Sequence, residues 1–216
     1  MSPEPVILQT SDGVRLAGAY HAADQLRGQA LLLHMMPATK ESWSAFASRL
    51  SARGIASLAI DLRGHGASDG GPEGYKDFDD AAHQAKRLDV EAGLAWLRAK
   101  AGAPIVVAGA SIGANLAFRA LAEHEDVRAA MALSPGLDYR GVTTEDALAG
   151  LRVGQKLFLA ASAEDARSME CLAALDAAAP GRADIRRLDG AGHGTAMLER
   201  DQAFFDAAVE WLVAAV

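Results

Sequence analysis

The sequence predicts an α/β protein with a mostly parallel sheet that carries helices on both faces. Short apolar runs alternate with longer amphipathic segments along the chain, a rhythm typical of β-α-β units. Hydrophobic residues make up 50% of the chain and charged residues 23%, the balance of a packed globular protein. The chain has 216 residues and no break in composition, which predicts one domain over residues 1–216.

An antiparallel hairpin opens the predicted fold. Ser-Asp-Gly, whose Gly13 can take a positive φ, separates two strand-like runs at 6–10 and 14–20. The later apolar runs predict further strands at 30–35, 56–60, 105–110, 129–133, 156–161 and 184–189. The amphipathic segments between them predict helices at 41–53, 78–99, 112–123, 166–178 and 202–215. Ligands of such sheets bind beyond the carboxyl ends of the strands, so chemistry is expected just after strands.

The motif Gly-x-Ser-x-Gly at 109–113 joins a predicted strand to a predicted helix. A sharp turn there would present the Ser111 hydroxyl, and Gly109 and Gly113 leave room for strained backbone and close packing. Free N–H groups at the helix start would also suit developing negative charge. The alternative is a plain turn in which Ser111 only caps the helix.

With this motif in place, the chain resembles the α/β-hydrolase family over nearly its whole length. The resemblance is to small serine esterases without a cap domain, similar to dienelactone-hydrolase-like members. It implies an eight-stranded, mostly parallel sheet and a triad in the chain order nucleophile, acid, histidine. Dienelactone hydrolases usually carry a cysteine nucleophile, so serine argues against that particular activity.

Two later loops supply the remaining triad residues that the resemblance implies. Asp165 follows the strand at 156–161, and His193 lies in Gly-Ala-Gly-His-Gly after the strand at 184–189. Because a serine hydroxyl is a weak nucleophile, an imidazole must take its proton and a carboxylate must orient the imidazole. We prefer Asp165 to Glu164 as the acid, with Asp138 as a third candidate. Asp165 could instead only cap the next helix.

The segment His34-Met35-Met36-Pro37 resembles the family's His-Gly-x-Pro sequence. The resemblance implies an oxyanion hole made by the backbone N–H groups of Met36 and Ile112. Met35 replaces the usual glycine, which leaves open whether the turn forms without substrate. Both methionines could instead fill the core.

The loop Asp61-Leu62-Arg63-Gly64-His65-Gly66-Ala67-Ser68 resembles the family's D-x-R-G-x-G-x-S loop, and we interpret it as scaffold. Arg63 is expected to pair with carboxylates or carbonyls there. His65 could rival His193 as the base, but a histidine at this position fits the structural pattern. The remaining histidines are expected at the surface, at positions 21, 83 and 124.

Residues 135–155 leave room for one short helix rather than a cap, so an open cleft lined by Met35, Met36 and Trp43 is expected. The sequence therefore predicts a cofactor-free serine carboxylesterase that hydrolyses small to medium acyl esters through an acyl-enzyme. The enzymatic alternatives are a thioesterase, a lysophospholipase and a small serine peptidase. An alternative of another class is a non-catalytic binding protein on the same fold.

The composition weighs against several other functions. A net charge of −7 and a pI near 5.3, with no basic cluster, argue against nucleic acid and anionic lipid as partners. No apolar run approaches the ~20 residues that span a bilayer. Cys171 is the single cysteine and the N-terminus lacks a signal-peptide pattern, so a cytoplasmic location is expected. Paired metal-ligand histidines are missing, so no metal is expected. We expect a small-molecule ester as the partner and a monomer or homodimer.

Overall fold

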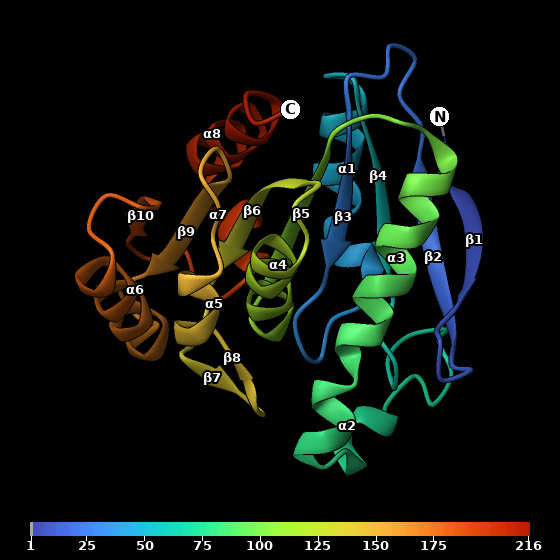
Figure 1. Ribbon diagram of the computed structural model, residues 1–216, viewed down its shortest axis with the longest axis horizontal. Coiled ribbons are helices and arrows are strands. Elements are labelled where there is room, and N and C mark those ends of the chain that lie inside the picture. Colours follow the sequence, from blue (N-terminus) through green and yellow to red (C-terminus); the bar gives the residue numbers. More distant parts are fainter. Residues whose placement is uncertain (1) are drawn as a thin grey trace.

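The computed structural model describes residues 2–216 and contains one large sheet (Figure 1). Its order is β1-β2-β4-β3-β5-β6-β9-β10, where β1 and β2 form the antiparallel hairpin, β2 also pairs antiparallel with β4, and the other neighbours are parallel. The mostly parallel, eight-stranded sheet with an N-terminal hairpin is therefore confirmed. The strands are β1 (Glu4–Gln9), β2 (Arg15–His21), β3 (Gly28–Leu33), β4 (Ile55–Ile60), β5 (Ile105–Ala110), β6 (Val127–Leu133), β9 (Lys156–Ser162) and β10 (Asp184–Leu188).

The five predicted helices are present, with differences in where they begin and end. The segment at 41–53 starts as a 3-10 turn before it becomes α1, and the helix at 78–99 is interrupted at Ala85. Asp79 caps the first of the two pieces by accepting a hydrogen bond from Ala82 N. The longer helices are α1 (Ser44–Ser51), α3 (Lys86–Lys100), α4 (Ile112–Glu123), α6 (Ala166–Ala178) and α8 (Gln202–Val213). The short ones are η1 (Lys40–Trp43), η2 (Gly74–Asp77), α2 (Asp80–Gln84), α5 (Glu145–Ala149) and α7 (Ala196–Arg200).

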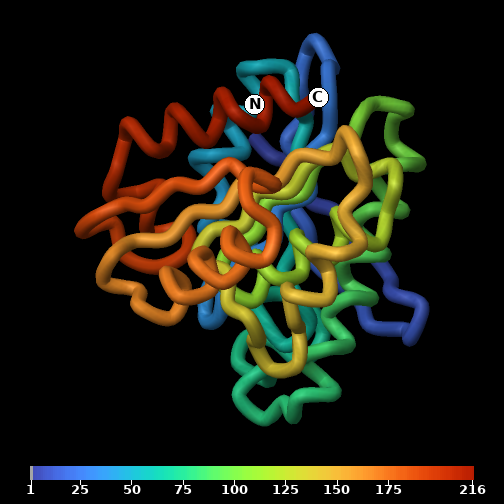
Figure 2. Tube along the Cα trace, turned by 60° about the vertical axis from the view of Figure 1, so that its left-hand side comes forward, coloured from blue at the N-terminus to red at the C-terminus, as the bar shows by residue number. Residues whose placement is uncertain are grey.

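The sheet separates two hydrophobic cores. On one face α3, α4 and α6 contribute buried residues such as Leu94, Leu116 and Leu172. On the other face α1 and α8 contribute residues such as Phe46 and Val209, and Figure 2 shows α8 in red along this flank. Central strands covered on both sides explain the unbroken apolar runs in the sequence, because neither face of these strands meets water.

The segment after β6, where larger hydrolases carry a cap, is short. It contains the two-residue strands β7 (Asp138–Tyr139) and β8 (Val142–Thr143) and then α5. The sequence predicted only one short helix here. Along residues 2–216, no helix combines the length and hydrophobicity needed to cross a membrane.

Candidate active site

Ser111 lies at the sharp turn between β5 and α4. Its backbone has φ 54° and ψ −119°, a left-handed conformation that is costly for a residue with a side chain. The two motif glycines make the turn possible: a Cβ on Gly109 would lie 1.9 Å from Gly113 O, and a Cβ on Gly113 would lie 2.4 Å from Leu33 O. The helix start therefore packs directly against the end of β3, and the serine sits at the carboxyl edge of the sheet.

Asp165 and His193 come together as a hydrogen-bonded pair. His193 Nδ1 lies 2.6 Å from Asp165 Oδ2, while Asp165 Oδ1 accepts a hydrogen bond from Ser168 N at 3.3 Å and caps α6. Burial disfavours the Asp165 carboxylate, but the hydrogen bonds from Ser168 and His193 outweigh it and hold its pKa below the usual value. One carboxylate thus combines the two roles that the sequence left as alternatives.

The loop that carries His193 is held by acceptors on its N-terminal side. The Glu164 carboxylate accepts hydrogen bonds from Gly190 N at 3.1 Å, Gly192 N at 2.5 Å and the Ser162 hydroxyl at 2.6 Å. Ser162 Oγ in turn accepts from Ala191 N at 3.0 Å. Glu164, the rival candidate for the acid, therefore contacts the loop backbone, and these hydrogen bonds lower its pKa to about 2.

Ser134, which no sequence motif marks, holds the same loop from its other side. Its backbone φ is 54°, and its hydroxyl, buried at the end of β6, accepts a hydrogen bond from Gly194 N at 2.9 Å. Ser111 N donates to Leu133 O at 2.9 Å, so the turn that carries Ser111 and the loop that carries His193 meet at the end of β6. Among the hydrogen bonds of residues 2–216 there is none between Ser111 and His193. Such contacts often tighten only when substrate binds.

His34 shapes the predicted oxyanion loop. Its Nδ1–H donates to Met35 O at 2.9 Å and its Nε2 accepts from Leu62 N at 2.9 Å, so both ring nitrogens are used by the neutral ring. Burial is the main reason that its pKa falls to about 3. Met35 lies against Gly194 of the histidine loop, where a Cβ would come within 2.5 Å of Met35 Sδ. The loop of residues 34–36 thus borders the histidine loop.

A buried lysine lies beneath Met36. Lys86 is fully buried, with Nζ 3.7 Å from Met36 Sδ and 3.0 Å from His83 Nδ1. Burial lowers the pKa of Lys86 to about 8 and that of His83 to about 4. The expectation that His83 lies at the surface is wrong, because its ring turns inward to accept a hydrogen bond from this lysine.

The loop of residues 61–68 has the contacts of a scaffold. Arg63 pairs with Asp89 at 2.7 Å and with Asp12 at 2.7 Å, and the buried Asp61 carboxylate binds Lys40 Nζ at 2.7 Å. His65 places Nδ1 3.0 Å from Arg63 O and stacks on Tyr75, with 4.1 Å between ring centroids. Along the described residues 2–216, no carboxylate pairs with the His65 ring nitrogens, as expected for a structural histidine.

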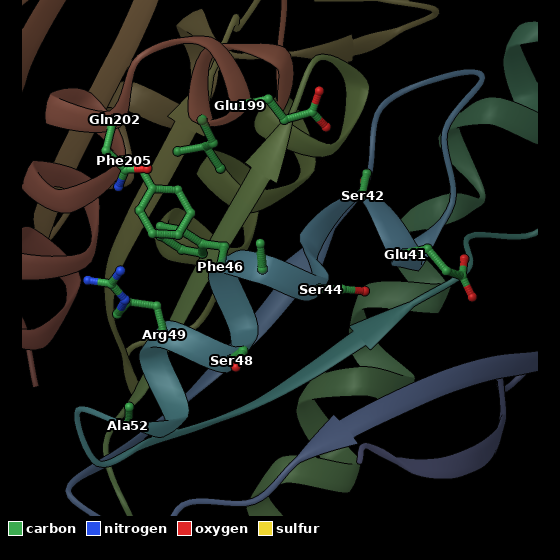
Figure 3. A pocket seen from close by; sticks show the side chains of 12 residues that line it. Glu41, Ser42, Ser44, Phe46, Ser48, Arg49, Ala52, Glu199, Gln202 and Phe205 are labelled. Atoms are coloured by element: carbon green, nitrogen blue, oxygen red, sulfur yellow. The ribbon is translucent and has the colours of Figure 1, made fainter. Parts of the chain in front are cut away.

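Trp43 does not line an open cleft, and this expectation needs correction. Its side chain is fully buried in the core between the sheet and α8, where its ring centroid lies 5.6 Å from that of Phe46. Its neighbours instead form a groove of about 850 Å³ between α1 and the α7–α8 segment (Figure 3). Residues lining that groove include Phe46, Arg49, Glu199 and Phe205, and none of the three predicted triad residues is among them.

Within residues 2–216, one group of three side chains has the composition of a metal site. Ligand atoms of Glu91, Glu123 and His124 lie within 4.8 Å of one another, with His124 Nε2 3.0 Å from Glu91 Oε1. They sit at the end of α4 opposite to Ser111, so a metal there would not reach the triad. Cys171 is buried and its pKa is raised to about 11, which leaves an unreactive thiol.

The sequence matches a model of a known protein family. The family model described as serine aminopeptidase, S33, matches residues 24–165, a range that includes Ser111 and Asp165 and ends before His193. No curated protein matches the chain.

Solved structures show the same fold at low sequence identity. An esterase from Pyrococcus furiosus superposes with a TM-score of 0.76 at 19% identity, covering 99% of this chain and 91% of its own. The α/β-hydrolase GrgF from Penicillium has a TM-score of 0.79 at 16% identity, covering 100% and 99%. A dienelactone hydrolase from Anabaena variabilis has a TM-score of 0.75 at 18% identity, covering 100% of both chains. The α/β-hydrolase architecture expected from the sequence is thereby confirmed.

Proposed function

The chain belongs to the serine aminopeptidase S33 family of hydrolases, and on that premise we propose that it is a single-domain serine carboxylesterase. Its substrates would be small to medium acyl esters, hydrolysed through an acyl-enzyme on Ser111. The observation that carries the proposal is the 2.6 Å contact of His193 with Asp165, in a loop that Ser134 ties to the strand end beside the nucleophile turn.

The proposed reaction follows from the roles of these side chains. Ser111 Oγ attacks the ester carbonyl while His193 Nε2 takes its proton, and Asp165 fixes the imidazole by accepting from Nδ1. The N–H groups of Met36 and Ile112 would stabilise the oxyanion, each contributing roughly 3 kcal/mol to the transition state. His193 then gives its proton to the leaving alcohol, and water releases the acid in a second round. This chemistry requires no cofactor.

The charge around the site favours an ester over an aminopeptidase substrate. Binding a substrate with a free amine requires a nearby carboxylate that can pair with the ammonium group. Asp165 is occupied by His193 and Ser168, and Glu164 is occupied by the loop amides and Ser162. The short segment after β6 leaves room for small, flexible acyl chains. We further propose that the enzyme works in the cytoplasm as a monomer or homodimer.

Steady-state hydrolysis tests the proposal. The purified protein should cleave p-nitrophenyl acetate and butyrate faster than the octanoate, faster than an acyl thioester and faster than an aminoacyl p-nitroanilide. Ser111→Ala should lower ester turnover by at least about 10⁴-fold while the circular dichroism spectrum stays unchanged. Cleavage of the nitroanilide alone, or full activity in Ser111→Ala, would contradict it.

A further inference from the structure

Tyr139 brings a phenol hydroxyl into the triad region from the short hairpin that follows β6. Its hydroxyl lies 3.4 Å from Ser134 O and 3.5 Å from Ser168 Oγ. The Ser111 side chain lies near the same hydroxyl, and its proximity lowers the pKa of the phenol against the larger effect of burial. Tyr139 therefore lies near the proposed nucleophile and contacts residues next to both other triad loops.

The Tyr139 ring is held between two neighbours. A Cβ on Gly136 would lie 2.8 Å from the ring, so only glycine allows this close approach without a shift. On the ring face, the Arg167 guanidinium lies 4.9 Å from the ring centroid and is fixed by a 2.6 Å hydrogen bond to Asp138 O. The phenol is thus packed in place rather than free to rotate into solvent.

The hairpin is anchored to the helix that begins at the nucleophile. Asn115, fully buried in the first turns of α4, donates to Gly136 O at 2.8 Å and to Val142 O at 2.6 Å, and it accepts from Gly136 N at 3.0 Å. Because these hydrogen bonds span both ends of the hairpin, α4 fixes Ser111 and Tyr139 relative to each other.

The hydrogen-bonding capacity of the Tyr139 and Ser111 hydroxyls decides which of them would donate in a hydrogen bond between them. Burial raises the pKa of Tyr139, so the phenol stays protonated at neutral pH and has a proton to donate. Ser111 Oγ has two lone pairs and one proton, and that proton must point toward His193 for catalysis. A phenol that donates to a lone pair of Oγ leaves the serine proton free for the imidazole.

We propose that Tyr139 is a further catalytic residue, whose hydroxyl turns from Ser134 O to donate a hydrogen bond to Ser111 Oγ during the reaction. This inference rests on the proposed esterase function. During attack, the serine proton passes to His193, Oγ bonds to the carbonyl carbon, and the carbonyl electron pair moves onto its oxygen. During deacylation the Oγ–carbon bond breaks, and Oγ keeps the pair and recovers the proton from His193. Tyr139 keeps its own proton and stabilises the partial charge on Oγ in both steps.

The test is Tyr139→Phe, which removes the hydroxyl and keeps the ring between Gly136 and Arg167. The matched control is Tyr20→Phe on β2, where the tyrosine packs against Trp96 at 5.0 Å, three strands away from β5 in the sheet. With p-nitrophenyl butyrate, Tyr139→Phe should lower kcat roughly tenfold and leave KM within about twofold. Labelling of Ser111 by a fluorophosphonate should slow by a similar factor, and Tyr20→Phe should match the wild type in both measurements.

Two results separate failure of this inference from failure of the esterase function. If the wild type turns over ester and is labelled, but Tyr139→Phe keeps its kcat or changes only KM, the inference is overturned and the esterase function stands. If the wild type shows neither turnover nor labelling, both fall together. Unchanged thermal midpoint and near-ultraviolet circular dichroism establish that Tyr139→Phe is folded.

Discussion

Asp165 Oδ2 and His193 Nδ1 lie 2.6 Å apart, and the second oxygen of the same carboxylate caps α6 through Ser168 N. The cap fixes the carboxylate relative to the helix, so the imidazole is oriented by a group that cannot rotate away. Because the Asp165 carboxylate both orients His193 and caps α6, substitutions of Asp165 and of its neighbour Glu164 should differ in their effect on activity.

Asp165→Asn should lower kcat/KM by about 10³- to 10⁴-fold, because the amide cannot stabilise the imidazolium. Asparagine is still a good helix cap, so the thermal midpoint should change little. Glu164→Gln should cost less than about tenfold, since an amide oxygen can still accept from the loop N–H groups. Steady-state kinetics of both variants check this. A larger loss in Glu164→Gln would reassign the acid.

Ser134→Ala should lower kcat/KM about tenfold, because Gly194 N loses its acceptor and the histidine loop gains freedom. The matched control is Ser57→Ala on β4, which removes another fully buried hydroxyl, one that has no hydrogen-bond partner within residues 2–216. Ser57→Ala should keep full activity. Equal activity losses in the two variants would show that Ser134 acts only through packing.

The buried histidines predict acid sensitivity. Burial lowers the pKa of His34 to about 3 and of His65 to about 4, against 6.5 for the free side chain. Below pH 6.5 these histidines therefore bind protons in the unfolded chain but not in the folded chain. The free energy of unfolding falls as the pH drops toward the lowered pKa values. Each histidine contributes up to about 1.4 kcal/mol per pH unit. Urea unfolding between pH 7 and 4 should show a shallower pH slope in His34→Gln, and an identical slope would contradict this account.

Lys86 predicts that stability also rises with pH in an alkaline range. The folded chain releases this proton near pH 8, whereas the unfolded chain holds it to about pH 10.5, so the unfolded state binds more protons in that window. Stability of the wild type should therefore rise relative to Lys86→Met from pH 8 to 10.5, by up to about 3 kcal/mol. Lys156→Met, which removes a lysine at an exposed site, is the control variant. Denaturant unfolding at several pH values provides the measurement.

The elements that the sequence predicted best have local signals at their ends. The strand at 105–110 and the helices at 112–123 and 166–178 have the predicted bounds, because the Gly-x-Ser-x-Gly turn and the Asp165 cap mark them. The prediction for Trp43 was wrong because its burial depends on core residues distant in the chain. The prediction for His83 was wrong because the helix that carries it is interrupted at Ala85. Ser134 and Tyr139 lie in a segment without periodicity. Their positions follow from β6 lying between β5 and β9, which no local pattern predicts.

The most direct test of the central claim is covalent labelling with a fluorophosphonate, followed by intact mass and peptide mapping. The account predicts one phosphonyl adduct per chain, located on Ser111, absent from Ser111→Ala and formed far more slowly in His193→Ala. An unmodified wild type under conditions that label a control serine hydrolase, or an adduct on another residue, would contradict it.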